Sequence, residues 1–184
     1  MTLAPASVRL LVCGTADRGD DGAALLVVAH LLPRLGPAMC ARLEVRRCSQ
    51  LDPSDIIDVP TGTTCLVVDT AVGLEPGTVV TMPLAALAAR PVGVSPRSSH
   101  ALPVDEVIAL AEVIRGSLPD GSFVGIGGKW FGYGSRFSRA LRAGIPDLEA
   151  AIVAELVRMT GVPVGPSEPV EPCGPVAALA PALK

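Results

Sequence analysis

Short apolar runs alternate along this chain with longer segments of helical periodicity, and this alternation restricts the possible folds more than any other feature. The apolar runs predict strands at 8–14, 43–49, 64–70, 75–82 (after a turn) and 122–128. The periodic segments predict helices at 20–36, 52–59, 103–116 and 135–159, the last interrupted near Gly144 and Pro146. Such alternation predicts an α/β fold, a three-layer sandwich in which helices flank a mainly parallel sheet.

Chain length and composition indicate one globular domain followed by a tail. The chain has 184 residues, of which 49% are hydrophobic and 18% charged, and this suffices for a hydrophobic core. We expect a single α/β domain over residues 1–160. Residues 161–184 are rich in proline, with a proline at every third position from 163 to 175, which is typical of an extended polyproline II segment.

Charge, aromatic content and cysteine spacing argue against several classes of protein. The net charge is -3 and aromatic residues make up 3% of the chain, so nucleic acid is not an expected partner. The five cysteines are odd in number and form no CxxC pair, which favours reduced thiols. The sequence shows no signal peptide and no apolar stretch long enough to span a membrane. These features predict a soluble, cytoplasmic protein.

Acidic and histidine side chains follow the predicted strands at points that will share one sheet edge. Asp20 and Asp21 come after the first strand, Asp69 ends the third, and His100 lies in a serine-rich loop further on. In open α/β sheets this edge, at the carboxyl ends of the strands, is where ligands bind. Each residue also has a structural interpretation: an acid can cap a helix, and His100 can be an ordinary loop residue. His30, within an apolar helix, is interpreted as structural.

Two carboxylates and one imidazole form a ligand set suited to a divalent transition metal. Imidazole shifts the preference toward nickel, copper or zinc and away from magnesium. A site with three protein ligands keeps coordination positions open for a reacting group or for a partner. The spacing therefore indicates a metal-assisted reaction or a metal that is shared with another molecule.

Four motifs in order across residues 8–160 resemble those of the [NiFe]-hydrogenase maturation endopeptidases. The first is the glycine turn with an acidic pair, "CGTADRGDDG", and the second is "VVDTAVGLEPGTV", an aspartate at a strand end before a Pro-Gly turn. The third is the Ser-x-His loop "SSHALPVDEVIALA", and the fourth is "GIGGKWFGYGSRFSRALRAGIP". The resemblance implies a five-stranded twisted sheet of the phosphorylase/hydrolase-like type.

The same resemblance implies an activity, a substrate and a set of site residues. Members of that family are endopeptidases that remove the C-terminal extension of the hydrogenase large subunit precursor after nickel insertion. The metal-contacting and catalytic positions carry over to Asp21, Asp69 and His100. The supporting positions carry over to Asp20, Gly14, Gly22 and Gln50. The implied protein is a metal-dependent, aspartic-type endopeptidase and a monomer.

The expected mechanism uses nickel that belongs to the substrate. Asp21, Asp69 and His100 would complete the coordination of that nickel and place the scissile bond beside it, with water as the nucleophile. The glycine turns would let a peptide backbone approach closely. Two alternatives stay open from the sequence: a non-cleaving nickel-sensing chaperone of the large subunit, and a small-molecule α/β enzyme that uses the same sheet edge.

Overall fold

The structure is a computed structural model that describes residues 7–90, 97–98 and 103–163. Its one sheet contains the strands β1 (Val8–Cys13), β2 (Leu43–Cys48), β3 (Thr64–Val72), β4 (Val79–Pro83), β5 (Arg97–Ser98) and β6 (Gly121–Gly127). The predicted proline-rich tail lies outside the described residues from 164 onward.

The sheet is mainly parallel, as the sequence predicted. Five strands follow the order β2-β1-β3-β6-β4, and only β4, at one edge, runs antiparallel to its neighbour within this order. The two-residue strand β5 adds an antiparallel pairing at the end of β3, where Ala71 lies opposite Ser98. The expected five-stranded α/β sandwich is confirmed, with β5 as a short addition.

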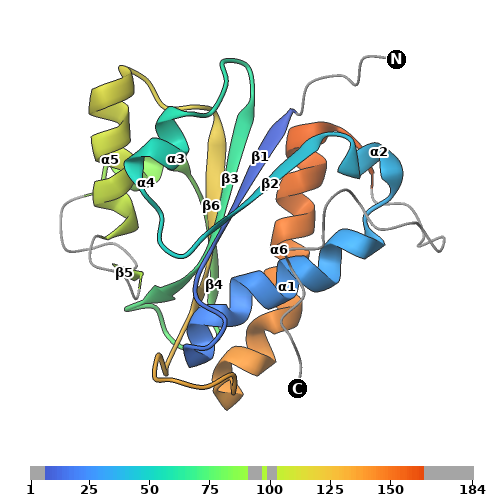
Figure 1. Cartoon of the computed structure of the whole chain (residues 1–184), viewed down its shortest axis with the longest axis vertical. Helices are drawn as coiled ribbons and strands as arrows, with labels where there is room; N and C mark the ends of the chain where they lie inside the picture. The colour runs from blue at the N-terminus through green and yellow to red at the C-terminus, as the bar shows by residue number, and fades with distance from the viewer. Residues whose placement is uncertain (1–6, 91–96, 99–102, 164–184) are drawn as a thin grey trace.

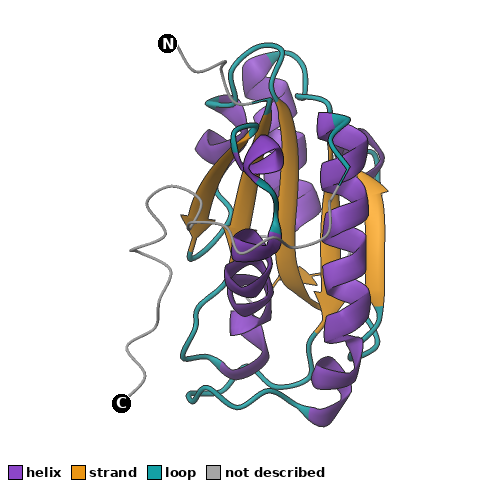
Figure 2. Ribbon diagram, turned by 90° about the vertical axis from the view of Figure 1, so that its right-hand side faces the viewer, coloured by secondary structure: helices purple, strands orange, loops and turns teal. Residues whose placement is uncertain are grey.

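Helices cover both faces of the sheet (Figures 1 and 2). They are α1 (Ala23–Leu31), α2 (Pro37–Cys40), α3 (Pro53–Ile57), α4 (Leu84–Ala88), α5 (Val104–Arg115) and α6 (Arg139–Thr160), with 3-10 turns at η1 (Gly19–Gly22) and η2 (Leu32–Arg34). Figure 1 shows α1 and α6 on one side of the sheet and α3, α4 and α5 on the other.

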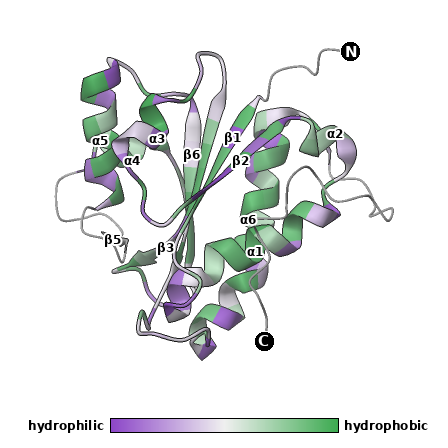
Figure 3. Cartoon of the chain, in the orientation of Figure 1, coloured by the Kyte–Doolittle hydropathy of each residue, from purple (hydrophilic) through white to green (hydrophobic). Residues whose placement is uncertain are grey.

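The core divides into two clusters because the strand residues alternate between the two faces. In β1 all six residues are buried. Leu10 and Val12 pack with α1 and α6, whereas Leu11 and Cys13 pack with α3, α4 and α5. Figure 3 shows the hydrophobic residues that run along α1, which lacks a clear polar face. A central strand buried on both faces fixes the position of the turn that follows it.

Two predicted helices differ from those observed. The helix predicted for 20–36 is α-helical only over Ala23–Leu31, since a 3-10 turn holds the acidic pair before it and another holds Pro33 after it. The break predicted near Gly144 and Pro146 is wrong, because α6 is continuous through both residues. Pro146 is exposed, and Gly144 is used for packing: a Cβ there would overlap the carbonyl oxygen of Gly77.

The topology creates a switch point between β1 and β3. The chain leaves β1 into α1 on one face of the sheet, and after β3 the next helices, α4 and α5, lie on the opposite face. This is the place in an open α/β sheet where ligands bind. None of the helices in the described part of the chain has the combination of length and hydrophobicity that crossing a bilayer requires.

Candidate functional site

Asp69 places a buried carboxyl group at the switch point. It lies near the end of β3 and its side chain is fully buried. Its Oδ1 accepts a hydrogen bond from the backbone N–H of Thr70 at 2.7 Å, whereas Oδ2 is buried and has no hydrogen-bond partner within the part of the chain that the structure describes. The pKa of Asp69 is raised to about 8, chiefly by burial and to a smaller extent by the Asp21 carboxylate, against the lowering effect of the hydrogen bond from Thr70.

Asp21 brings the second carboxyl group to the same place from the turn after β1. It lies in η1, is fully buried, and its Oδ2 accepts a hydrogen bond from the backbone N–H of Thr15 at 2.9 Å. Its effect on the pKa of Asp69 shows that the two carboxyl groups interact. Two buried acids that interact in this way favour a bound cation.

Gly14 and Gly22 allow the turn to close over Asp21. Gly14 follows β1 with φ of +129°, and a Cβ there would overlap the carbonyl oxygen of Asp21. At Gly22 a Cβ would lie 3.1 Å from the Cα of Ala16, which is also tight. The structure therefore gives both predicted supporting glycines a steric role in this turn.

Replacing Gly14 by Ala is expected to destabilise the protein by about 2–4 kcal/mol, because the substitution combines backbone strain with a steric overlap. Gly62→Ala is the matched control, since Gly62 has φ of +81° but no atom of the described residues lies within 4 Å of its added Cβ. Urea unfolding measures both variants. Equal losses of stability in the two variants would show that the protein relieves the overlap with Asp21 without an energetic cost.

Asp20 connects the loop between β6 and α6 to the turn η1 (Gly19–Gly22), which holds both acids and is called the acidic turn below. Its buried carboxylate accepts hydrogen bonds from the backbone N–H groups of Lys129 at 2.8 Å, Trp130 at 3.1 Å and Ser138 at 2.6 Å. The hydroxyl of Thr70 donates to the carbonyl oxygen of Asp20 at 3.0 Å. Helix α1 has no side-chain cap, so Asp20 orients the loop between β6 and α6 and does not cap α1.

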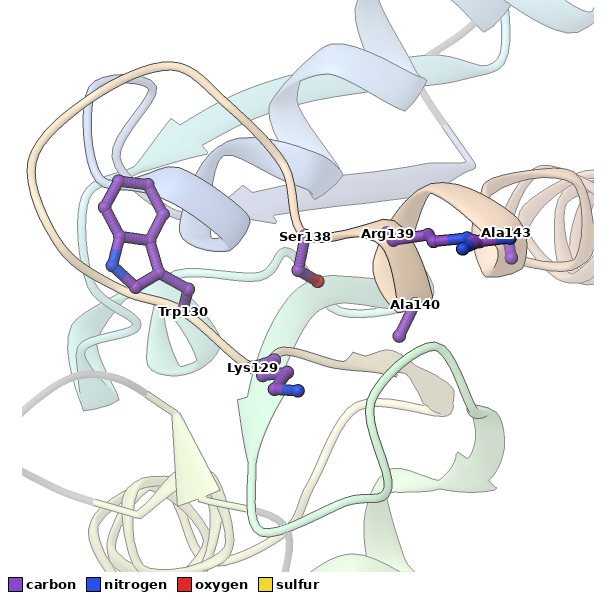
Figure 4. A pocket seen from close by; sticks show the side chains of 6 residues that line it. All are labelled: Lys129, Trp130, Ser138, Arg139, Ala140 and Ala143. Atoms are coloured by element: carbon purple, nitrogen blue, oxygen red, sulfur yellow. The ribbon is translucent and has the colours of Figure 1, made fainter.

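A surface hollow of about 680 Å³ lies beside the residues that Asp20 holds (Figure 4). It is lined by Lys129, Trp130, Ser138, Arg139, Ala140 and Ala143. Sequence reasoning assigned no role to these side chains. The loop did carry a signal, because four of the five aromatic residues of the chain lie within 130–137.

The third predicted metal ligand, His100, lies outside the described residues. Within the described ranges, no three His, Cys, Asp or Glu side chains gather as a metal ligand set. The described backbone does lead toward the site: Ser98, two residues before His100, pairs with Ala71, two residues after Asp69. His30 is exposed in the last turn of α1, away from the acidic pair.

The remaining predicted residues divide into exposed and buried groups. Gln50 is exposed after β2, at the same sheet edge, and is not among the residues lining the hollow. Cys13, Cys48 and Cys65 are reduced thiols in the structure and are buried. A hydrogen bond with Cys48 and burial raise the pKa of Cys13, and burial raises that of Cys65 to about 12. Such thiols stay protonated and do not serve as nucleophiles.

The fold and the described site define an α/β protein with a buried acid pair at its switch point. No known protein-family model matches the chain, and no curated protein matches its sequence. Solved structures do match. The chain is similar to the hydrogenase maturating endopeptidase HybD from Escherichia coli, with 18% identity and a TM-score of 0.64, over 86% of this chain and 96% of the other.

Two further solved structures support the same fold. An endopeptidase from Escherichia coli matches with 19% identity and a TM-score of 0.60 over 86% of this chain and 97% of its own. The [NiFe] hydrogenase maturation protease HybD from Thermococcus kodakarensis matches with 19% identity and a TM-score of 0.52 over 79% and 95%. The resemblance drawn from the four sequence motifs is thus confirmed at the level of the fold.

Proposed function

We propose that this protein is a hydrogenase maturation endopeptidase, which removes the C-terminal extension of the [NiFe]-hydrogenase large subunit precursor after nickel insertion. The observation that carries the proposal is the buried Oδ2 of Asp69, which has no hydrogen-bond partner among the described residues and belongs to a carboxyl group whose pKa the Asp21 carboxylate raises. The likeness in fold to the maturation proteases supports the same activity.

An unpartnered carboxylate oxygen in this position suits a cation brought by the substrate. A buried carboxylate is stable only when it is paired, protonated or bound to a metal. Because Asp69 has a pKa of about 8, it is protonated at neutral pH in the free protein. A cation that approaches Asp21 and Asp69 favours the ionised form, so docking of the nickel centre releases this proton.

In the proposed mechanism the acid pair and His100 recognise the loaded precursor and position the scissile bond. Asp21 and Asp69, with His100 as the third ligand inferred from the sequence motif, complete the coordination of the nickel held by the substrate. Water attacks the scissile carbonyl carbon, and a carboxylate of the pair accepts the proton that water loses. The same carboxyl group then donates this proton to the amide nitrogen as the C–N bond breaks, so that the C-terminal extension leaves as a free amine. A carboxyl group that titrates near neutral pH is suited to this proton transfer.

Mass spectrometry of the precursor tests the proposal. The protein is mixed with nickel-loaded and with nickel-free precursor, and the C-terminal extension should be lost from the loaded form alone. Asp21→Asn and His100→Ala should each abolish the cleavage while the circular dichroism spectrum is retained. Binding of the loaded precursor without any change of mass would instead indicate a non-cleaving chaperone. Full activity in either variant would exclude the metal-docking role of that residue.

A further inference from the structure

The loop between β6 and α6 presents aromatic side chains to solvent beside the acid pair. Four of the chain's five aromatic residues lie within 130–137. Trp130 is 43% exposed and Tyr133 is 86% exposed, which is unusual for such large apolar groups. Exposed aromatic residues of this kind are enriched where proteins bind other proteins.

This aromatic loop is held in place by contacts with the acidic turn. Gly19 donates its backbone N–H to Gly134 at 2.6 Å, and Gly134 donates to the carbonyl oxygen of Asp17 at 2.7 Å. A Cβ at Gly19 or at Gly132 would overlap the Trp130 ring, so the indole packs directly on both glycines. Together with the three hydrogen bonds to Asp20, these contacts fix the ring before any ligand arrives, and a preorganised surface loses little entropy on binding.

The same segment carries a local positive charge in a chain of net charge -3. Residues 121–146 contain no Asp or Glu but four cations, Lys129, Arg136, Arg139 and Arg142. Lys129 and Arg139 both line the hollow, together with Trp130 and two alanines (Figure 4). The hollow therefore combines an apolar wall with two positive side chains, and its complement is a ligand that is both apolar and acidic.

We infer that this hollow binds an extended, acidic segment of the protein substrate that carries at least one large apolar side chain. The inference rests on the proposed function, because it assigns the hollow to the precursor whose bond the acid pair positions. The two sites are contiguous: Asp20, which precedes Asp21, holds the backbone of Lys129 and Trp130. A substrate segment in the hollow thus lies next to the acidic turn.

Single-stranded nucleic acid is the competing ligand, because it also binds aromatic and cationic surfaces. The structure favours a peptide. A hollow of about 680 Å³ is the size of a small-ligand site, whereas nucleic acid requires a charged groove along several nucleotides. The overall negative charge of the chain further disfavours a polynucleotide.

Trp130 is the only tryptophan of the chain, so its fluorescence reports directly on the hollow. The probe is a synthetic hexapeptide of alternating glutamate and leucine, with a lysine–leucine hexapeptide and an oligothymidine as comparisons. We expect saturable quenching or a blue shift with the acidic peptide alone. Arg139→Glu should weaken this binding by about tenfold or more. The variant should fold, since a carboxylate is favourable in the first turn of α6.

Arg42→Glu is the matched control, because Arg42 is also exposed but lies just before β2, at the opposite end of the strands from the hollow. It should bind the acidic peptide within twofold of the unmodified protein. With nickel-loaded precursor as substrate, Arg139→Glu should raise KM about fivefold or more while kcat is retained, and Arg42→Glu should change neither constant.

The outcomes separate this inference from the proposed function. Cleavage of the precursor with KM unaffected by Arg139→Glu would overturn the docking role of the hollow and leave the endopeptidase proposal intact. If no cleavage occurs, the endopeptidase proposal fails, and peptide binding that is lost in Arg139→Glu still supports an acidic ligand for the hollow. A response to oligothymidine equal to or stronger than that to the acidic peptide would overturn the inference.

Discussion

Asp69→Asn is expected to make the protein more stable above pH 8 and to remove its activity. In the folded protein the pKa of Asp69 is about 8, against 3.8 for an unperturbed Asp. Between these values the folded state binds more protons than the unfolded state, so the contribution of this group to stability is lost as pH rises from about 4 to 8. An asparagine carries no charge and does not incur this loss.

Thermal unfolding from pH 5 to pH 9 measures the effect on stability. The advantage of Asp69→Asn should grow with pH and reach on the order of 2–5 kcal/mol above pH 8. Asp58→Asn, at an exposed position after α3, is the control and should show no such growth. A stability difference that is constant across this range would contradict the raised pKa.

The same variant tests the role of Asp69 in cleavage. Asparagine retains an oxygen for the Thr70 N–H but cannot ionise, so it offers a cation no negative charge. We expect the rate of cleavage of nickel-loaded precursor to fall by about 10³-fold or more. Greater stability combined with lost activity is typical of a residue that is retained for function against its cost to folding. Wild-type cleavage by the variant would exclude Asp69 from the site.

The strands and the acid pair were predictable because local patterns determine them. β1 and β3 are short, mainly apolar runs, which is the pattern of a parallel strand that is covered on both faces. The positions of Asp21 and Asp69 then follow from the parallel order of the two strands. The start of the helix predicted at 52–59 is local in the same way, since Asp52 and Asp55 form a capping box within the first turn of α3.

What could not be predicted depends on contacts between distant parts of the chain. The carboxylate of Asp20 has its partners 109, 110 and 118 residues further along, and no local pattern indicates them. The break predicted in α6 failed for a related reason: Gly144 faces the turn at Gly77, and this packing contact is invisible in the helix's own sequence. The aromatic cluster at 130–137 was visible in the sequence as a bias in composition. Its position beside the acidic turn, however, is evident only from the structure.

Asp20→Ala should be the most destabilising of the substitutions around the acidic turn, with an expected loss of about 3–5 kcal/mol. It leaves three backbone N–H groups without their charged acceptor and removes the main connection between the acidic turn and the loop at 129–138. Asp20→Asn keeps one carbonyl oxygen and should lose less. Asp52→Ala, which removes the exposed cap of α3, should have a much smaller effect.

Asp20→Ala should also have a local effect that can be measured apart from global stability, because it releases the loop at 129–138. Without Asp20 the Trp130 ring should leave its position on Gly19 and Gly132, so its fluorescence should shift to longer wavelength even where the protein stays folded. Amide hydrogen exchange of Lys129, Trp130 and Ser138 should accelerate in Asp20→Ala but not in Asp52→Ala. Unchanged exchange in the loop would mean that the remaining backbone hydrogen bonds suffice to hold it, namely that from Asp20 to the carbonyl oxygen of Trp130 and those of Gly134 with Asp17 and Gly19.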